Sequence, residues 1–266
     1  MYKQSFTDEQ EKKLRASCGV SHCIENFLTD SEFALCRKLV LNKKNYPEHG
    51  EVSKYWGFGW DSGAGPLLKW LKEKVDTILP NWKLDYLAIQ EGITPWKIHP
   101  DINWHPDRIP YKVMLLPMDV EPVTGPVSID EWPETYSIAF HQHNFLSKQP
   151  VEVVTTLSDD MVIDKSQQNY HAHSHGNIYA KVNRPYDDPS VEGLQPGYHI
   201  SEELWNKHFS HMPYEYSEGL TLDSMHQWIP KSVMLWDSSA LHCADNFLSK
   251  NIKTKRSLMI FTVLDE

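Results

Sequence analysis

Cysteine is scarce in this chain, and long apolar runs are missing. The four cysteines, Cys18, Cys23, Cys36 and Cys243, are unevenly spaced, so they do not form the framework of a disulfide-stabilised protein. Cys18 and Cys23 lack a second cysteine pair, which argues against a structural zinc site. The N-terminal residues have no apolar segment typical of a signal peptide, and no apolar run approaches the length of a membrane span. We therefore expect a soluble cytoplasmic protein with reduced thiols.

Positive charge is also in deficit. The chain has 26 lysines and arginines against 36 acidic residues, which gives a formal net charge of −10. This balance argues against nucleic acid or an anionic membrane surface as the main partner. There are no repeats and no low-complexity tract, and 266 residues are within range for one large β domain. We expect a single domain over residues 1–266; the sequence does not indicate its oligomeric state.

The apolar periodicity changes near residue 84. Before it, helices are predicted at 7–16, 30–42 and 66–79, with a strand at 54–60. After it, short strands separated by Pro, Gly and Asp turns are predicted at 84–91, 96–99, 111–117, 136–140, 151–157, 177–182, 232–236 and 257–264. This order is typical of an all-β core, a jelly roll (double-stranded β-helix, cupin-like), with a helical N-terminal buttress at 1–83. We expect the segment 183–230, with a helix at 201–209, to be an insertion or lid.

Histidine is abundant, and 14 residues of this type raise the expectation of a metal site. His99 and Asp101 stand two residues apart at the end of a predicted strand, so both side chains project to one face. His242 follows an apolar strand and a turn, where a third ligand would enter from a neighbouring strand. Two imidazoles and one carboxylate leave three positions open, which suits non-haem iron(II). His105 and Asp107 repeat the spacing, but only the first copy has a strand leading into it.

A basic strand start follows the third candidate ligand. Arg256 opens the last predicted strand, 14 residues after His242. A guanidinium forms two parallel hydrogen bonds to a carboxylate, whereas the neighbouring Lys255 offers only a point charge. Arg256 can therefore anchor the far carboxylate of a dicarboxylic cosubstrate.

These segments together resemble the iron(II)/2-oxoglutarate-dependent oxygenase superfamily, in particular its phytanoyl-CoA, prolyl and aspartyl hydroxylase-like members. The resemblance covers roughly residues 84–120 and 231–264, and it rests on HPD at 99–101, YKVMLLP at 111–117, WDSSALHCADNF at 236–247 and KRSLMIFT at 255–262. It implies metal ligands at His99, Asp101 and His242. The family commonly places its basic residue nearer the distal histidine, so the choice between Lys255 and Arg256 stays open.

The resemblance also implies a reaction. The chain would hydroxylate a substrate with Fe(II), O₂ and 2-oxoglutarate, and it would release succinate and CO₂. Tyr111 is a candidate for a hydrogen bond to the cosubstrate. Asp101 favours hydroxylation over halogenation, because halogenases of the superfamily lack the carboxylate ligand.

The substrate is not readable from the sequence, and a small molecule or a peptide fits equally well. Candidate substrate contacts are His105, His141, His143 and Trp104, and Trp96, Trp104 and Trp236 are candidates for a dry aromatic wall. His171, His173 and His175 alternate on one face, so a cupin-type metalloenzyme that does not use 2-oxoglutarate is the first alternative. A non-catalytic jelly-roll binding protein is the second.

Overall fold

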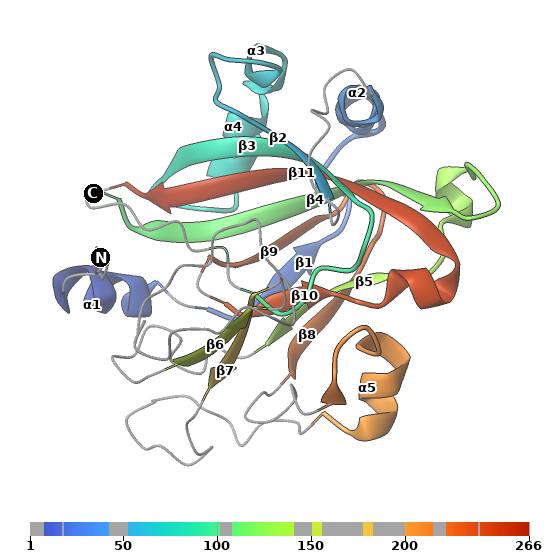
Figure 1. Ribbon diagram of the computed structural model, residues 1–266. Helices are drawn as coiled ribbons and strands as arrows, with labels where there is room; N and C mark the ends of the chain where they lie inside the picture. Colours follow the sequence, from blue (N-terminus) through green and yellow to red (C-terminus); the bar gives the residue numbers. More distant parts are fainter. Residues whose placement is uncertain are drawn as a thin grey trace.

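Two antiparallel sheets form the framework of the protein. The computed structural model describes residues 8–17, 19–42, 53–99, 101, 108–140, 151–155, 178–182, 200–214, 222–238 and 240–265 (Figure 1). The larger sheet has the order β1 (His22–Ile24), β9 (Val233–Asp237), β4 (Pro110–Pro122), β11 (Ile252–Leu264), β3 (Trp82–Gly92) and β2 (Ser53–Phe58). The smaller sheet has the order β10 (His242–Ala244), β5 (Tyr136–Phe140) and β8 (Leu222–Gln227). A separate hairpin pairs β6 (Val151–Thr155) with β7 (Ile178–Val182).

Helices cover one face of the larger sheet (Figure 1). Helix α2 (Asp30–Leu41) begins at a capping box in which Thr29 and Glu32 satisfy each other's backbone N–H groups. It buries Phe33, Cys36 and Val40 against the sheet, beside α3 (Gly65–Leu68) and α4 (Leu71–Asp76). The predicted helix at 66–79 is thus two short helices. The remaining helices are α1 (Asp8–Ala16), α5 (Glu202–His208) and the 3-10 turns Ile129–Glu131 and Phe247–Lys250.

Strand β11 shows how the larger sheet separates two cores. Leu258 and Ile260 pack into the cluster that contains the helices. Met259 and Phe261 pack into a second cluster on the opposite face. Successive side chains of a strand point to opposite faces, so odd-numbered residues here face away from the helices. That second cluster includes Trp228 and Phe247, and Ala244 of the smaller sheet packs against it, so it lies between the sheets.

The smaller sheet has its own two faces. Ile138, Phe140 and Cys243 pack on one side with Trp205 and Phe209, the residues that bring α5 onto the sheet. The pairing of the strands places His242 beside Ala139 and Ala139 beside Ser224. These three therefore share the other face, which looks toward the larger sheet.

Most predicted elements are present among the described residues, but several strands differ. Strands β1, β8 and β10 were not predicted, and the strand expected at 96–99 is a single bridge between His99 and His242. Residues 222–227 lie in the segment expected to be an insertion or lid, yet they form a strand of the smaller sheet. Among the described helices, none is long and apolar enough to cross a membrane.

Candidate metal centre

Three potential metal ligands converge between the sheets. His99, Asp101 and His242 each offer one ligand atom, and these atoms all lie within 4.8 Å of one another. Asp101 Oδ2 is 3.1 Å from His242 Nε2, and Asp101 Oδ1 is 3.9 Å from His99 Nε2. The ring of His242 lies 4.9 Å from that of Trp236 on β9, so the group sits against the inner face of the larger sheet.

Backbone hydrogen bonds place the three ligands. His99 and His242 exchange N–H···O bonds of 2.9 Å in both directions, which makes them direct neighbours across the bridge. The N–H of Asp101 donates to the carbonyl of Ser238 at 2.9 Å. His99 and Asp101 thereby direct their side chains into the same space that His242 enters.

The imidazoles are oriented for metal binding through Nε2. His99 Nδ1 lies 2.6 Å from the carbonyl oxygen of Lys97, and His242 Nδ1 lies 3.0 Å from that of Ala240. A carbonyl can only accept, so each Nδ1 carries a hydrogen, and Nε2 is the ring nitrogen left to bind a metal ion. Such a carbonyl partner is the usual support of a metal-bound histidine.

The charges of the three groups are coupled. Burial lowers the pKa of His99 to about 4, and the nearby His242 adds to this effect. Burial acts to raise the pKa of Asp101, but the charge and hydrogen bond of His242 outweigh it and keep that pKa below its usual value. The same pairing with Asp101 raises the pKa of His242 against the effect of burial. The carboxylate is therefore ionised at neutral pH, as a metal ligand must be.

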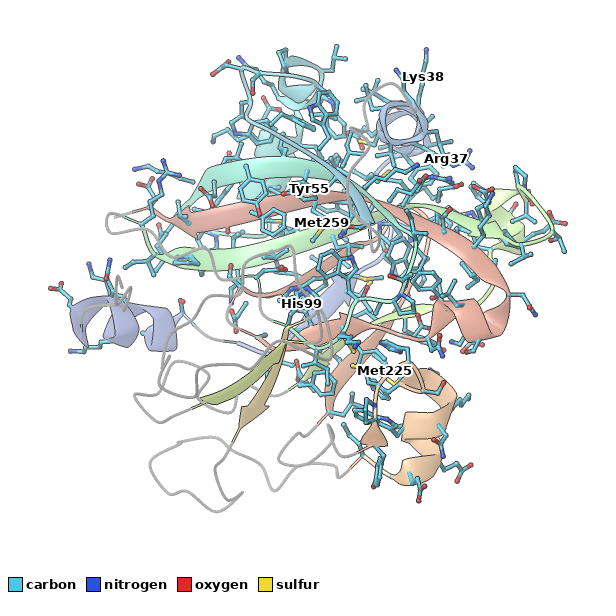
Figure 2. The ribbon with its side chains drawn as sticks, viewed as in Figure 1. Arg37, Lys38, Tyr55, His99, Met225 and Met259 are labelled. Carbon is cyan, nitrogen blue, oxygen red and sulfur yellow. The ribbon has the colours of Figure 1, made fainter. Side chains whose placement is uncertain are left out.

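Aromatic side chains lie beside the centre and on the inner face of the larger sheet. Trp96 lies 5.1 Å from the ring of His99. On the larger sheet, Tyr86 stacks on Phe261 at 4.2 Å and meets Tyr55 edge-on at 6.4 Å. Figure 2 shows Tyr55 and Met259 on the larger sheet, on the side that faces His99. Burial, Tyr86 and the charge of Asp101 all raise the pKa of Tyr55, so its phenol stays neutral beside the candidate metal ligands.

Sequence reasoning missed Tyr55 and Tyr86. Along β2, Tyr55 and Gly57 alternate with Trp56 and Phe58, so the two pairs lie on opposite faces of the strand. This alternation could have indicated the face on which Tyr55 lies.

Lys255 lies on the inner face of β11. Its side chain is 4% exposed, and Nζ donates to the Tyr136 carbonyl at 2.9 Å. Nζ is also 3.5 Å from Asp245 Oδ1 and 4.1 Å from the centre of the Trp228 ring. Burial lowers the pKa of Lys255 to about 8, although Asp245 opposes this effect. The amine is therefore a poorly solvated cation at neutral pH.

Arg256 points to the opposite face of the sheet, contrary to the expectation that it anchors a cosubstrate. Its Nε donates to Glu91 at 2.5 Å, Nη1 to Asp119 at 2.6 Å and Nη2 to Glu121 at 2.7 Å. All three nitrogens thus serve buried or half-buried carboxylates, and none is directed at the metal centre. Burial acts to lower the pKa of Arg256, but the three carboxylates outweigh it and raise that pKa.

Tyr111 is likewise away from the centre. It packs in the core cluster beneath the helices, with residues such as Leu71 and Met114. The suggestion of a hydrogen bond to a cosubstrate is therefore not supported. The other candidates, His105, His141, His143, Trp104 and the trio His171, His173 and His175, lie outside the described residues.

No family model and no curated protein matches the sequence, but several solved structures are similar to it. The non-heme, alpha-ketoglutarate-dependent carbocyclase SnoK of nogalamycin biosynthesis is 11% identical, with 99% of this chain and 86% of that chain covered and a TM-score of 0.48. HygX from Streptomyces hygroscopicus, with nickel and 2-oxoglutarate bound, is 10% identical, with coverages of 98% and 88% and a TM-score of 0.48.

A third similar structure is a prolyl hydroxylase from Trichoplax adhaerens in complex with a peptide fragment of the hypoxia inducible factor oxygen degradation domain. It is 11% identical, with coverages of 99% and 96% and a TM-score of 0.44. The solved structures similar to this chain thus include 2-oxoglutarate-dependent enzymes. At these low identities, a function for this chain has to rest on its own residues.

Proposed function

We propose that this protein is an Fe(II)- and 2-oxoglutarate-dependent dioxygenase that hydroxylates a substrate still to be identified, with succinate and CO₂ as co-products. The observation that carries the proposal is the convergence of His99, Asp101 and His242 within 4.8 Å, with both Nδ1 atoms turned to backbone carbonyls. This donor set fits iron(II), because two imidazoles and one carboxylate on one side of the ion leave three positions for cosubstrate and O₂. Bound iron would supply the activation of O₂, with two electrons drawn from the decarboxylation of 2-oxoglutarate and two from the substrate C–H bond.

The path of the chain supports a jelly roll as the finer description of the fold. From β3 onward the chain passes from the larger sheet to the bridge at His99, then to β4, to β5 and β8, to β9, to β10 and finally to β11. It thus changes sheet at nearly every step, which is how a jelly roll winds its two sheets. That winding brings His99 and His242 together although 142 residues lie between them.

We further propose that Lys255 holds the far carboxylate of 2-oxoglutarate. Lys255 shares the inner face of β11 with Met259 and Phe261, the face on which the metal centre lies. A buried ammonium favours an anion strongly, because little water competes for it. Asp245, the carboxylate beside Lys255, would keep other donors if Lys255 bound a cosubstrate. Lys250 Nζ at 2.6 Å and Thr135 Oγ1 at 2.6 Å also bind Asp245.

Polar neighbours of Lys255 would complete this cosubstrate site. The pairing of β11 with β3 sets Ser257 opposite Gln90, and both side chains alternate onto the inner face. On the smaller sheet, Ser137 lies in the row of Ala244 and accepts a hydrogen bond from the Trp228 indole at 2.9 Å. Hydroxyl and amide donors at these positions can bind a carboxylate together with the ammonium.

The role of the chain itself is then to position and to exclude water. The carbonyls of Lys97 and Ala240 fix the rings of the two histidine ligands, and the aromatic wall of Tyr55, Tyr86 and Phe261 keeps the space dry. The substrate would be a small molecule or a peptide that places one C–H bond in this space.

Thermal unfolding with and without metal tests the proposed centre. Cobalt(II) or manganese(II) at about a hundred times its dissociation constant contributes about 2.7 kcal/mol, which for a chain of this size raises the unfolding midpoint by about 5 to 10 °C. We expect this rise in the wild type and not in Asp101→Ala. His22→Ala, which removes an exposed histidine outside the centre, is the control and should keep the rise. An equal rise in Asp101→Ala would place the metal elsewhere.

A further inference from the structure

Two of the three proposed metal ligands depend on the turn that follows β9. The carbonyl of Ser238 accepts the N–H of Asp101 at 2.9 Å. The carbonyl of Ala240 accepts Nδ1 of His242 at 3.0 Å. The position of Asp101 and the ring orientation of His242 are therefore set by the same few backbone atoms.

Asp237 is the first residue of this turn and holds the turn in place. Its carbonyl accepts the N–H of Ala240 at 2.9 Å, while the N–H of Ser238 donates to the Tyr111 carbonyl at 3.0 Å. The Asp237 side chain is 2% exposed, and its Oδ1 is bound by the ammonium of Lys112, the residue opposite it on β4. A carboxylate at this depth is stable only while both of its oxygens have donors.

The donor to the other carboxylate oxygen, Asp237 Oδ2, comes from the N-terminal segment. The N–H of Gly19 donates to Asp237 Oδ2 at 2.8 Å, and the carbonyl of Ser17 accepts from Lys112 Nζ at 2.9 Å. Two residues on, Ser21 is held by Asp223 through its N–H at 2.9 Å and its hydroxyl at 2.5 Å. Ser17 and Gly19, which lie between α1 and β1, thus close over the Lys112–Asp237 ion pair.

We propose that the Lys112–Asp237 ion pair, closed by the backbone of Gly19, is a positioning element for the metal ligands Asp101 and His242, and that the N-terminal segment thereby controls metal affinity. The inference rests on the proposed function, because it takes these residues as ligands. Loss of either donor leaves part of a buried carboxylate unpaired, so the turn shifts to recover hydration and carries the carbonyls of Ser238 and Ala240 with it. Groups that orient metal ligands in this way typically change metal affinity by about 10- to 100-fold.

Gly19 offers a matched pair of variants at an exposed residue. Gly19→Pro removes the N–H that binds Asp237, whereas Gly19→Ala keeps it and adds a methyl group at an ordinary 3.8 Å from Lys112 Nζ. Cobalt(II) affinity of the full chain, measured by competition with a chelating dye, should fall at least about tenfold in Gly19→Pro. It should stay within twofold of wild type in Gly19→Ala.

Lys112→Met provides an independent second variant with its own control. Lys74 resembles Lys112, since it is half-buried and binds one carbonyl, that of Phe27, and one carboxylate, that of Glu32, but it lies on α4 away from the centre. Both Lys112→Met and Lys74→Met should lower the unfolding midpoint of the metal-free protein. Only Lys112→Met should weaken cobalt(II) binding by about tenfold and change the visible d–d absorption of the cobalt complex.

The outcomes separate the inference from the function beneath it. Absence of cobalt(II) binding in the wild type overturns both. Wild-type binding with unchanged affinity in Gly19→Pro and Lys112→Met overturns the positioning role alone. Equal weakening in Lys74→Met also overturns it, because the effect would then be a general loss of stability.

Discussion

Lys255 and Arg256 are neighbours in the chain, and their side chains lie on opposite faces of β11. Lys255 enters the space between the sheets beside Trp228, while Arg256 joins three carboxylates on the side of the helices. Two adjacent cations thus have separate tasks, one proposed for the cosubstrate and one for the stability of the sheet.

Replacement of Lys255 tests the cosubstrate half of this division. Lys255→Met keeps most of the side-chain volume but removes the ammonium, so the affinity of the iron-loaded protein for 2-oxoglutarate should fall by about 2 kcal/mol or more, roughly thirtyfold. Anaerobic calorimetric titration with 2-oxoglutarate measures this change. Iron binding itself should persist, because Lys255 contacts none of the three ligands among the described interactions. Unchanged affinity for 2-oxoglutarate would remove Lys255 from the site.

Replacement of Arg256 tests its contribution to the stability of the sheet. Arg256→Met leaves Glu91, Asp119 and Glu121 without their common partner, and breaking a buried pair in this way costs about 3 to 5 kcal/mol. Denaturant unfolding should show that loss. Arg37 also binds Asp119, and this second partner reduces the expected loss of stability. The folded fraction should still bind 2-oxoglutarate with wild-type affinity. A selective loss of 2-oxoglutarate binding at unchanged stability would restore Arg256 as the anchor.

The pH dependence of 2-oxoglutarate binding follows from Lys255. Burial lowers its pKa from 10.5 to about 8, so the amine is a cation below about pH 8 and becomes neutral above it. Binding of the cosubstrate dianion needs the cation, and its affinity should therefore be full below about pH 8. Above that value it should fall by up to about tenfold for each pH unit. Lys255→Arg keeps its charge throughout this range and is the control; a wild-type profile that is flat to pH 10 contradicts the assignment.

The convergence of His99, Asp101 and His242, the proposed metal ligands, could be predicted from the sequence for a simple reason. His99 and Asp101 are two residues apart on an extended segment, a spacing that fixes their common face without knowledge of the fold. His242 follows an apolar strand and a turn, which is a local pattern too. Beyond these local patterns, the convergence requires only that the segment ending at His99 pairs with the one that begins at His242.

The choice between Lys255 and Arg256 could not be predicted in the same way. Leu258, Met259, Ile260 and Phe261 are all apolar, because both faces of β11 are buried, so the strand carries no polar alternation that marks the inner face. The short strands β1, β8 and β10 were missed for a related reason. Their residues have little strand preference of their own, and pairing with longer strands holds them in place.

The most direct test of the central claim is an anaerobic titration of the iron(II)-loaded protein with 2-oxoglutarate, followed by visible absorption. Chelation of iron by the keto and carboxylate oxygens of the cosubstrate produces a metal-to-ligand charge-transfer band. We predict that this band forms with one equivalent of 2-oxoglutarate in the wild type, is lost in Asp101→Ala and requires a much higher 2-oxoglutarate concentration in Lys255→Met. Iron binding without any such band would contradict the proposed use of 2-oxoglutarate.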